Sequence, residues 1–391
     1  MLKDKNILIG ITGGISCYKI LELCSRLKKK EANLKIVMTE AATKFVTPLS
    51  FETMGKCEVY TDLFSGTHSK VHHVELGKWA DVFLIAPLSA NTMAKITYGI
   101  ADNFLTSTYL AYDKDLIVAP SMNTNMLNNP ATQKNISILK QRGVRFIESE
   151  SGMLACNTVG DGRLREPIDI VDYLEYYFTK KDLVGKNIVI TAGPTVSKID
   201  YVRYITNHSS GKMGYNIALS ARNRGANVTL ITGPVHPFDI NGIDIINISS
   251  NDDLKNAIDS KFDDCDALIM AAAPIDYKIE NYVDRKIKKD GNNLELKLIE
   301  SDDILRYFGL KKKNQKIIGF AAETDDLIAN ATKKLNSKKA DYIVANNLKT
   351  EDAGFDVDTN IASIISKDGV KNYPKMLKSE LSDVILDLVG D

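Results

Sequence analysis

Three residues in the first half of the chain have side chains suited to proton transfer, polar binding or nucleophilic chemistry. His73 lies in a polar segment shortly before the only Trp, and an imidazole exchanges protons near neutral pH. The segment Pro120-Ser-Met-Asn123 directly follows a predicted strand, which places Asn123 at the carboxyl edge of a sheet. Cys156 lies in the glycine-punctuated loop 152–162, where a thiol is more reactive than in a core. These residues predict a small-molecule active site, although a solvated surface histidine would also explain His73.

Two polar turns in the same half have the form of anion sites. Gly13-Gly14-Ile-Ser16 joins a predicted strand to a helix, whose first turn offers free N–H groups and the positive end of its dipole. Segment 86–92 places a second polar cluster, including Ser89, at the end of another strand. The full G-x-G-x-x-G spacing is absent, and Ser89 also fits a helix N-cap. A phosphate site and a tightly packed turn therefore remain alternatives.

The second half has basic residues beside a helix start. Ser209-Ser210-Gly211 offers hydroxyls and backbone N–H groups to a phosphate, while Arg203 and Lys212 add positive charge. A Walker A motif is excluded, because Met follows Lys212 where Ser or Thr is required. A capped helix with a solvated lysine is the alternative interpretation.

Further candidates follow later strands of this half. Segment 271–276 ends one predicted strand in Asp276, and the basic run 286–289 comes ten residues later. Lys334 and Lys338 are spaced i,i+4, so they share one helix face. Exposed lysines are common, and these spacings alone do not define a site.

The elements around these residues alternate between strands and helices. A strand at 6–12, a glycine turn, a helix at 16–30 and a strand at 34–38 form a parallel α/β unit. Further strands are predicted at 81–86, 115–119, 144–147, 187–192, 227–232, 266–271, 316–320 and 341–345. Helices are predicted at 89–98, 101–112, 130–142, 168–178, 211–224, 251–262, 325–338 and 376–389. Asp-Gly turns predict β-hairpins at 286–298 and 361–372.

The restart of the α/β pattern at residue 187 predicts two Rossmann-like α/β domains, the second with antiparallel additions. A length of 391 residues agrees, since one hydrophobic core stops growing near about 250–300 residues. The polar segment 179–187 places the boundary near residue 183, giving domains 1–182 and 183–391.

The amino-acid composition limits the classes of binding partner to be expected for this protein. The 50 basic and 50 acidic residues give no net charge, which argues against nucleic acid and membrane partners and favours small molecules. The sequence has no long apolar run and no signal-peptide core, so we expect a soluble, cytoplasmic protein. Its five cysteines are odd in number and form no Cys-x-x-Cys pair, which argues against disulfides and a zinc site.

Several motifs, in this order, resemble the flavin-dependent cysteine decarboxylases: Gly13-Gly14-Ile, His73 before Val-Glu-Leu, Ser89-Ala-Asn-Thr92, Pro120-x-Met-Asn123 and Ala155-Cys156. The spacing to Leu76 selects His73 rather than its neighbour His72. Taken with the second half, the whole chain resembles the bifunctional phosphopantothenoylcysteine decarboxylase/phosphopantothenate–cysteine ligases of coenzyme A synthesis.

The resemblance implies a flavodoxin-like decarboxylase domain at 1–182. In this family FMN oxidises the thiol-bearing carbon of the substrate, and the resulting thioaldehyde becomes the electron sink for decarboxylation. His73 would be the base, Asn123 and Met126 would bind substrate, and Cys156 would donate the proton of the reductive half-reaction. The residues implied for FMN are Gly14, Ser16, Thr39, Ser89, Asn91, Thr92 and Thr106.

The resemblance also implies a Rossmann-like ligase domain at 183–391, which joins cysteine to 4′-phosphopantothenate after CTP has activated the carboxylate. Asn207 and Arg203 would organise the acyl-cytidylate, and Lys286 would stabilise charge during amide formation. The residues implied for CTP are Met270, Ala271, Ala272, Asp276, Lys286, Ser301, Asp302, Asp303, Ile304, Phe320, Lys334 and Lys338. Magnesium would accompany the triphosphate, and the chain would form a homo-oligomer with shared flavin sites.

Two other functions are weighed against this one. A flavin decarboxylase of peptide C-terminal cysteines, with a fused helper domain, would not need Asn207 and Lys286. A nucleotide-binding sensor without catalysis would lack one or more of His73, Asn123, Cys156, Asn207 and Lys286. All five residues are present.

Overall fold

The computed structural model describes residues 2–64, 71–153, 159–235, 240–289, 291, 293–323, 326–347 and 357–390. The chain divides into two compact units, Met1–Thr179 and Lys180–Asp391, and each is described by itself. The second unit begins within the polar segment 179–187 of the sequence.

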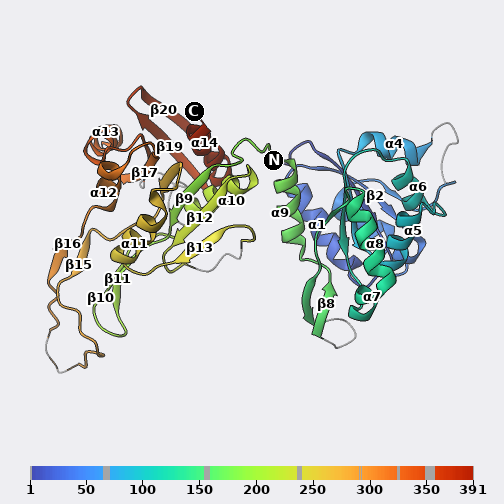
Figure 1. Ribbon diagram of the computed structural model, residues 1–391, viewed down its shortest axis with the longest axis horizontal. Coiled ribbons are helices and arrows are strands. Elements are labelled where there is room, and N and C mark those ends of the chain that lie inside the picture. The colour runs from blue at the N-terminus through green and yellow to red at the C-terminus, as the bar shows by residue number, and fades with distance from the viewer. Residues whose placement is uncertain are drawn as a thin grey trace. The chain divides into compact units, whose positions relative to one another are not determined.

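The first unit is built on a six-stranded parallel sheet in the order β3-β2-β1-β4-β5-β6 (Figure 1). Its strands are β1 (Asn6–Ile11), β2 (Asn33–Met38), β3 (Val59–Tyr60), β4 (Val82–Leu88), β5 (Leu116–Pro120) and β6 (Arg145–Phe146). This is the order of a Rossmann sheet, and without the two-residue β3 the other five strands follow the flavodoxin-like order 2-1-3-4-5. The strand order reverses between β1 and β4, where such sheets bind ligands.

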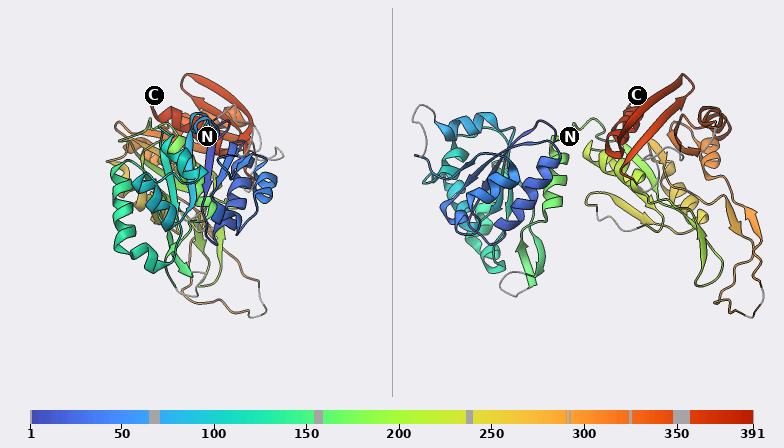
Figure 2. Two further views of the ribbon diagram at one scale, coloured as in Figure 1. Left: turned by 90° about the vertical axis from the view of Figure 1, so that its right-hand side faces the viewer. Right: turned by 180° about the vertical axis from the view of Figure 1, so that it is seen from behind.

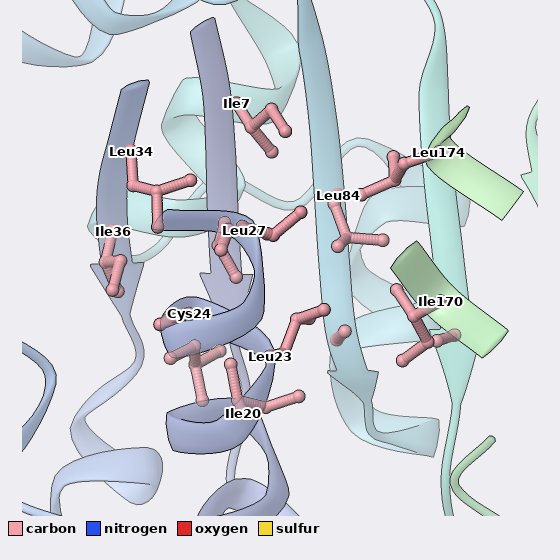
Figure 3. Close-up of a cluster of buried hydrophobic side chains, with 14 of the residues drawn as sticks. Ile7, Ile20, Leu23, Cys24, Leu27, Leu34, Ile36, Leu84, Ile170 and Leu174 are labelled. Carbon is pink, nitrogen blue, oxygen red and sulfur yellow. The ribbon is translucent and has the colours of Figure 1, made fainter. Parts of the chain in front are cut away.

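Helices cover both faces of this sheet. One face carries α1 (Cys17–Lys29), α3 (Pro48–Gly55) and α9 (Pro167–Phe178), and the other carries α4 (His72–Trp79), α5 (Ala90–Tyr98), α6 (Phe104–Leu110) and α8 (Pro130–Gln141). Figure 3 shows Leu23 of α1 and Ile170 of α9 directed at the strands, where both are fully buried. Each such side chain contributes roughly 1.5–3 kcal/mol relative to exposure, so the apolar stripes fix both helices on the sheet.

A hairpin follows the sheet, where the sequence predicted only a loop at 152–162. Strands β7 (Glu150–Met153) and β8 (Val159–Arg163) pair antiparallel. Their glycine content hides the usual strand pattern, because glycine is depleted in strands. Tertiary hydrogen bonds support the hairpin instead: the backbone N–H of Met122 donates to the Gly162 carbonyl at 3.0 Å, and Thr124 Oγ1 donates to the Asp161 carbonyl at 2.7 Å.

The second unit has an eight-stranded sheet in the order β13-β12-β9-β14-β17-β18-β19-β20. Its strands are β9 (Asn187–Ala192), β12 (Asn227–Thr232), β13 (Asp244–Asn247), β14 (Ala267–Met270), β17 (Lys316–Glu323), β18 (Tyr342–Asn347), β19 (Thr359–Ser366) and β20 (Gly369–Leu377). The first six in this order are parallel, and β19 and β20 are antiparallel additions. The predicted hairpin at 361–372 and the Rossmann-like class with antiparallel additions are thus confirmed.

Two helix layers enclose this sheet as well. One face is covered by α10 (Lys212–Asn223) and α14 (Lys378–Gly390), and the other by α11 (Asn251–Phe262), α12 (Ile304–Lys311) and α13 (Leu327–Lys338). The strand order reverses between β9 and β14, so the turns after these two strands mark the expected ligand edge. The predicted strands at 6–12, 187–192 and 227–232 are among those confirmed.

An arm projects from the second unit beyond the sheet (Figures 1 and 2). It consists of β10 (Val196–Lys198) paired with β11 (Tyr204–Thr206), and of the described residues within 277–300, where β15 (Tyr277–Ile279) pairs with β16 (Leu298–Glu300). The Ile279 N–H donates to Ser197 Oγ at 2.9 Å, which joins the two parts of the arm.

The predicted hairpin at 286–298 is wrong in its pairing. The antiparallel stem is formed by 277–279 with 298–300, and the described residues between 286 and 297 belong to no strand. The physical reason lies at Ile287, whose N–H donates to the Asp200 carboxylate at 3.1 Å and whose carbonyl accepts from Arg203 at 2.9 Å. Its backbone groups are therefore used in tertiary hydrogen bonds instead of a strand ladder.

In the part of the chain that the structure describes, no helix is both long and apolar enough to span a membrane bilayer.

Candidate functional site

The turns after β1 and β4 of the first unit are held together by a buried hydroxyl. Thr12 is fully buried, and its Oγ1 donates to the Pro87 carbonyl at 2.7 Å and accepts from the Ser89 N–H at 2.8 Å. This bond sets the start of α5, where Ser89 Oγ accepts from the Thr92 N–H at 3.3 Å. Ser89 is therefore an N-cap, as one sequence interpretation held, and it also lies at the point where the strand order reverses. Thr12 was not among the residues predicted from the sequence.

The two glycines after β1 have different surroundings. A Cβ on Gly13 would lie 2.6 Å from the Ala41 Cβ, so this residue permits a close contact with α2 (Glu40–Thr43). A Cβ on Gly14 would meet only Ser16 Oγ, at 3.9 Å. Gly13 thus explains the packing of the turn, while Gly14 faces open space beside the start of α1.

A second hydroxyl contact joins α1 to the segment after β5. Ser16 Oγ donates to Ser121 Oγ at 2.9 Å, and Asn123 caps α7 (Thr124–Asn128) by accepting from the Asn125 N–H at 2.8 Å. The hairpin β7–β8 lies against this same segment through the bonds to Met122 and Thr124. The structure therefore brings Ser16, Ser89 and Asn123 to one edge of the sheet.

The remaining residues implied for FMN differ in exposure. Thr39 caps α2 directly after β2, and its N–H donates to the Ile11 carbonyl at 3.0 Å. Thr106 is fully buried and forms a capping box with Asn103 at the start of α6. Thr92 is buried and Asn91 is exposed in the first turn of α5. Met126, implied for substrate, is exposed in α7.

His73 lies in the first turn of α4, and its half-buried ring approaches the Phe104 ring of α6 edge-on at 6.5 Å. Phe104 is two residues before Thr106, so α6 connects the histidine with the residues implied for FMN. Among the described residues, no hydrogen bond joins His73 to Ser16, Ser89 or Asn123.

Cys156 lies outside the described residues, between β7 and β8. Four other cysteines are free. Burial raises the pKa of Cys57 to about 11 and that of Cys265 to about 12, and it also raises the pKa of Cys17 and Cys24. These four thiols are therefore protonated at neutral pH and are poor nucleophiles.

In the second unit, Asn207 connects β11 with the turn after β14. Its Nδ2 donates to the Ala273 carbonyl at 3.0 Å and to the Pro274 carbonyl at 3.1 Å. From the other side, the Thr195 hydroxyl donates to Asn251 at 2.6 Å and accepts from the Ile275 N–H at 3.0 Å. The Asn251 amide also donates to the Ile275 carbonyl, so the turn 273–275 is fixed by two side-chain amides and a hydroxyl. Of these residues, only Asn207 was predicted from the sequence.

The residues implied for CTP form a connected set at the carboxyl edge of the sheet. Met270 ends β14, and the Asp276 carbonyl accepts from the Ser301 N–H at 2.8 Å, which places the start of α12 beside the turn after β14. Ser301 Oγ is buried and has no hydrogen-bond partner among the described residues. Ala271 and Ala272 are half-buried, Ile304 is buried and Asp302 is exposed.

Two lysines of α13 face this set. Lys334 Nζ donates to the Phe320 carbonyl of β17 at 2.9 Å, and Lys338 forms an ion pair with Asp303, the N-cap of α12. The predicted i,i+4 relation therefore brings both lysines to the residues implied for CTP. Lys338 in this structure is paired with a carboxylate rather than solvated.

Arg203 and Lys286 lie on the arm. The Arg203 Nε donates to Asp200 Oδ2 at 3.0 Å, and Nη2 also donates to the same oxygen. The Asp200 side chain is fully buried, and the Arg203 guanidinium together with backbone N–H groups holds the pKa of this carboxyl well below its usual range. Lys286 is exposed one residue before Ile287. Asp200 was not among the residues predicted from the sequence.

Comparison with known proteins agrees with this division of the chain. Residues 1–178 match the family described as Flavoprotein, and residues 183–391 match the DNA/pantothenate metabolism flavoprotein C-terminal domain. The coenzyme A biosynthesis bifunctional protein CoaBC of Bacillus subtilis is 45% identical, with 100% of this chain and 98% of that protein covered. The protein of the same name from Escherichia coli is 37% identical over 99% of this chain and 97% of that protein.

Solved structures resemble the two halves separately. The C-terminal domain of a CoaBC protein is 37% identical, covers 54% of this chain and 97% of its own, and has a TM-score of 0.47. The FMN binding protein AtHal3 is 34% identical over 45% of this chain and 97% of its own, with a TM-score of 0.41. From the full-length relatives and the two domain matches, the chain belongs to the family of bifunctional coenzyme A biosynthesis proteins.

Proposed function

We propose that this chain catalyses two consecutive steps of coenzyme A biosynthesis. Residues 183–391 ligate cysteine to 4′-phosphopantothenate with CTP, and residues 1–182 decarboxylate the product to 4′-phosphopantetheine. The observation that carries the proposal is the presence of both domain matches in one chain that aligns end to end with bifunctional relatives. The order follows from the chemistry, because the decarboxylase needs the amide that the ligase forms.

The first unit has residues that fit FMN at its β1–β4 edge. Gly14 faces open space at the start of α1, and the hydroxyls of Ser16 and Ser89 lie at the two adjacent turns. A helix start with free N–H groups favours a phosphate there. The residues that would hold FMN are Gly14, Ser16, Thr39, Ser89, Asn91, Thr92 and Thr106. When bound, FMN supplies the oxidation that turns the substrate's thiol-bearing carbon into an electron sink.

The chain's own residues orient substrate and move protons in this scheme. The Asn123 amide is fixed at the sheet edge by its capping bond, and it holds the substrate carboxylate with Met126 beside it. The His73 imidazole takes the proton of the oxidative half-reaction, because its ring nitrogen can accept a proton as a general base. The Cys156 thiol donates the proton of the reductive half-reaction.

For the ligase, CTP binds at the carboxyl edge of the second sheet. The unpartnered hydroxyl of Ser301 is available for a polar group of the nucleotide, and Lys334 and Lys338 supply positive charge nearby. The carboxylate of 4′-phosphopantothenate displaces pyrophosphate from the α-phosphorus of CTP, and the cysteine amine then attacks the carbonyl carbon of the acyl-cytidylate and displaces CMP. Asn207 and Arg203 organise the acyl-cytidylate, and Lys286 stabilises the charge that develops during amide formation.

Magnesium and self-association complete the proposal. Magnesium enters with CTP and offsets the triphosphate charge. Among the described residues, no group of three or more His, Cys, Asp or Glu side chains could hold a metal ion, so no protein ligand is assigned. We also propose a homo-oligomer that works on small molecules in the cytoplasm.

Each step has a separate test. The purified chain, given 4′-phosphopantothenoylcysteine alone, should release carbon dioxide and form 4′-phosphopantetheine. Given 4′-phosphopantothenate, cysteine and magnesium, it should release pyrophosphate with CTP and more slowly with ATP. Failure of the first reaction would contradict the decarboxylase assignment, and absence of pyrophosphate would contradict the ligase assignment. Equal rates with the two nucleotides would contradict the preference for CTP.

A further inference from the structure

Lys286 lies on a part of the chain that has no strand ladder to hold it. The described residues around it belong to no strand, and Arg285, Lys286 and Lys288 are all exposed. A flexible lysine on such a segment would spread its charge over many positions. A residue that stabilises developing charge must instead stay near the reacting atoms, so the segment needs another support.

Asp200 provides such a support. Its side chain is fully buried, and its Oδ2 accepts from the Ile287 N–H at 3.1 Å and from Arg203 Nε at 3.0 Å. Its Oδ1 accepts from the N–H groups of Val202 at 2.8 Å and of Arg203 at 2.7 Å. One carboxylate therefore ties the β10–β11 turn to the segment that follows Lys286.

Arg203 closes the connection from the other side. Its Nη2 donates to the Ile287 carbonyl at 2.9 Å, so both backbone polar groups of Ile287 are bound by the Asp200–Arg203 pair. The Ile287 N–H and the Lys286 carbonyl belong to the same peptide group. The hydrogen bond of this N–H to Asp200 therefore fixes the backbone directly beside Lys286. A second contact lies three residues earlier, where the Val283 N–H donates to the Ile199 carbonyl at 3.3 Å.

We propose that Asp200 is a positioning residue of the ligase: with Arg203 it clamps the peptide between Lys286 and Ile287 and so holds the Lys286 ammonium at the reacting acyl group. The inference rests on the proposed function, since it assigns a role to Lys286 in amide formation. The alternative is that Asp200 only stabilises the arm. The two explanations differ in whether the effect of Asp200 on amide formation depends on Lys286.

A double-mutant cycle in the full-length chain separates them. The variants are Asp200→Asn, Lys286→Gln and the double substitution, assayed with CTP, magnesium, cysteine and 4′-phosphopantothenate. Without cysteine, activation of the carboxylate should give a burst of pyrophosphate. Cysteine is then added, and the rate of amide formation is measured. Asp200→Asn should slow amide formation on the order of 10²-fold and leave the burst intact. The double variant should be no slower than Lys286→Gln alone.

Asp284→Asn is the matched control. Asp284 is an exposed carboxylate on the same arm, and its hydrogen bond comes from the Tyr282 hydroxyl at 2.9 Å. This variant should form amide at the wild-type rate. If Asp200→Asn fails to fold, Asp200→Glu replaces it in the same cycle. The double variant should again form amide no more slowly than Lys286→Gln alone.

Hydrogen exchange gives a readout that does not depend on activity. Asp200→Asn should raise amide exchange in residues 286–288 at least tenfold and leave the sheet strands unchanged. Wild-type amide formation in Asp200→Asn, an additive loss in the double variant, or unchanged exchange at 286–288 would each overturn the proposal. A wild-type chain that releases no pyrophosphate would contradict the proposed function instead, and the exchange measurement would still decide whether Asp200 fixes the segment.

Discussion

The side-chain amide nitrogen of Asn207 donates to the Ala273 carbonyl at 3.0 Å and so joins β11 to the turn after β14. It also donates to the Pro274 carbonyl at 3.1 Å. Both amide protons are thus used to hold the turn that leads to the residues proposed for CTP. The residue that family resemblance assigns to the acyl-cytidylate therefore also shapes the loop beside it.

Asn207→Asp should impair ligation and spare decarboxylation. The carboxylate would place an oxygen against two carbonyl oxygens at about the distance where the amide donates now, so the turn would be repelled instead of held. We expect pyrophosphate-coupled amide formation to fall on the order of 10²-fold. Decarboxylation of supplied 4′-phosphopantothenoylcysteine, measured in the same preparation, should be unchanged. Equal loss of both activities would mean that the substitution disturbs more than this turn.

The adjacent glycines after β1 should respond differently to alanine. Gly13→Ala would bring a Cβ within 2.6 Å of the Ala41 Cβ and should destabilise the first unit by about 1–3 kcal/mol. Gly14→Ala meets no such clash, so the apoprotein should unfold like wild type, but the added methyl should weaken flavin retention at least tenfold. Denaturant unfolding and flavin titration test the pair. Full flavin affinity in Gly14→Ala would argue against a phosphate at this turn.

The ion pair between the buried Lys19 and the partly exposed Glu166 predicts a pH-dependent stability. Lys19 Nζ donates to Glu166 at 2.7 Å, and this bond lowers the pKa of Glu166. A lowered carboxyl pKa stabilises the fold above the ordinary Glu value of about 4.3 and loses that contribution as the pH falls through the lowered value. Lys19→Met should therefore cost about 1 kcal/mol at pH 7, discounted for the partial exposure of Glu166, and less near pH 3.

The only tryptophan, Trp79, lies in α4 and reports on unfolding of the first unit alone. Urea unfolding followed by its fluorescence measures the Lys19→Met effect at both pH values. Lys44→Met is the control, since the Lys44–Glu40 pair is exposed and 3.7 Å long. A loss for Lys19→Met that stays constant down to pH 3 would show that Glu166 ionisation is not its cause.

Cys156→Ser should stop the decarboxylase between its two half-reactions. A serine hydroxyl is a much weaker acid than a thiol, so the enethiol formed after decarboxylation would not be protonated and should remain bound. Carbon dioxide should appear in a single turnover, without 4′-phosphopantetheine. Cys57→Ser is the control, because burial keeps that thiol protonated. Normal product formation by Cys156→Ser would refute the assigned role.

The sequence predicted most strands and helices of the two sheets because their signals are local, but it did not predict β3, β13, α3, α4 and α12. Strand β4 is a continuous apolar run, and α1 has an apolar stripe at helical spacing, so both were recognised with little ambiguity. Ser89 was identified as a capping or binding residue, and the structure shows that it caps α5 at the edge where the strand order reverses. Motifs that follow strands in an α/β sheet gather at one edge by topology alone.

Contacts between distant residues were not predictable. Asp200 has no pattern of its own, and its role depends on Ile287, which is far along the chain. The same contact made the predicted hairpin at 286–298 wrong, because the turn signal Asp-Gly describes only local geometry. Thr12 and Asn251 were missed for a similar reason, since each acts through a partner on another element.

The most direct test is the stoichiometry of the coupled reaction. The purified wild-type chain should be yellow, and with CTP, magnesium, cysteine and 4′-phosphopantothenate under anaerobic conditions it should form 4′-phosphopantetheine. Pyrophosphate and carbon dioxide should appear in equal amounts, one of each for every product molecule. A colourless protein that releases neither, or pyrophosphate without carbon dioxide, would contradict the account of one chain performing both steps.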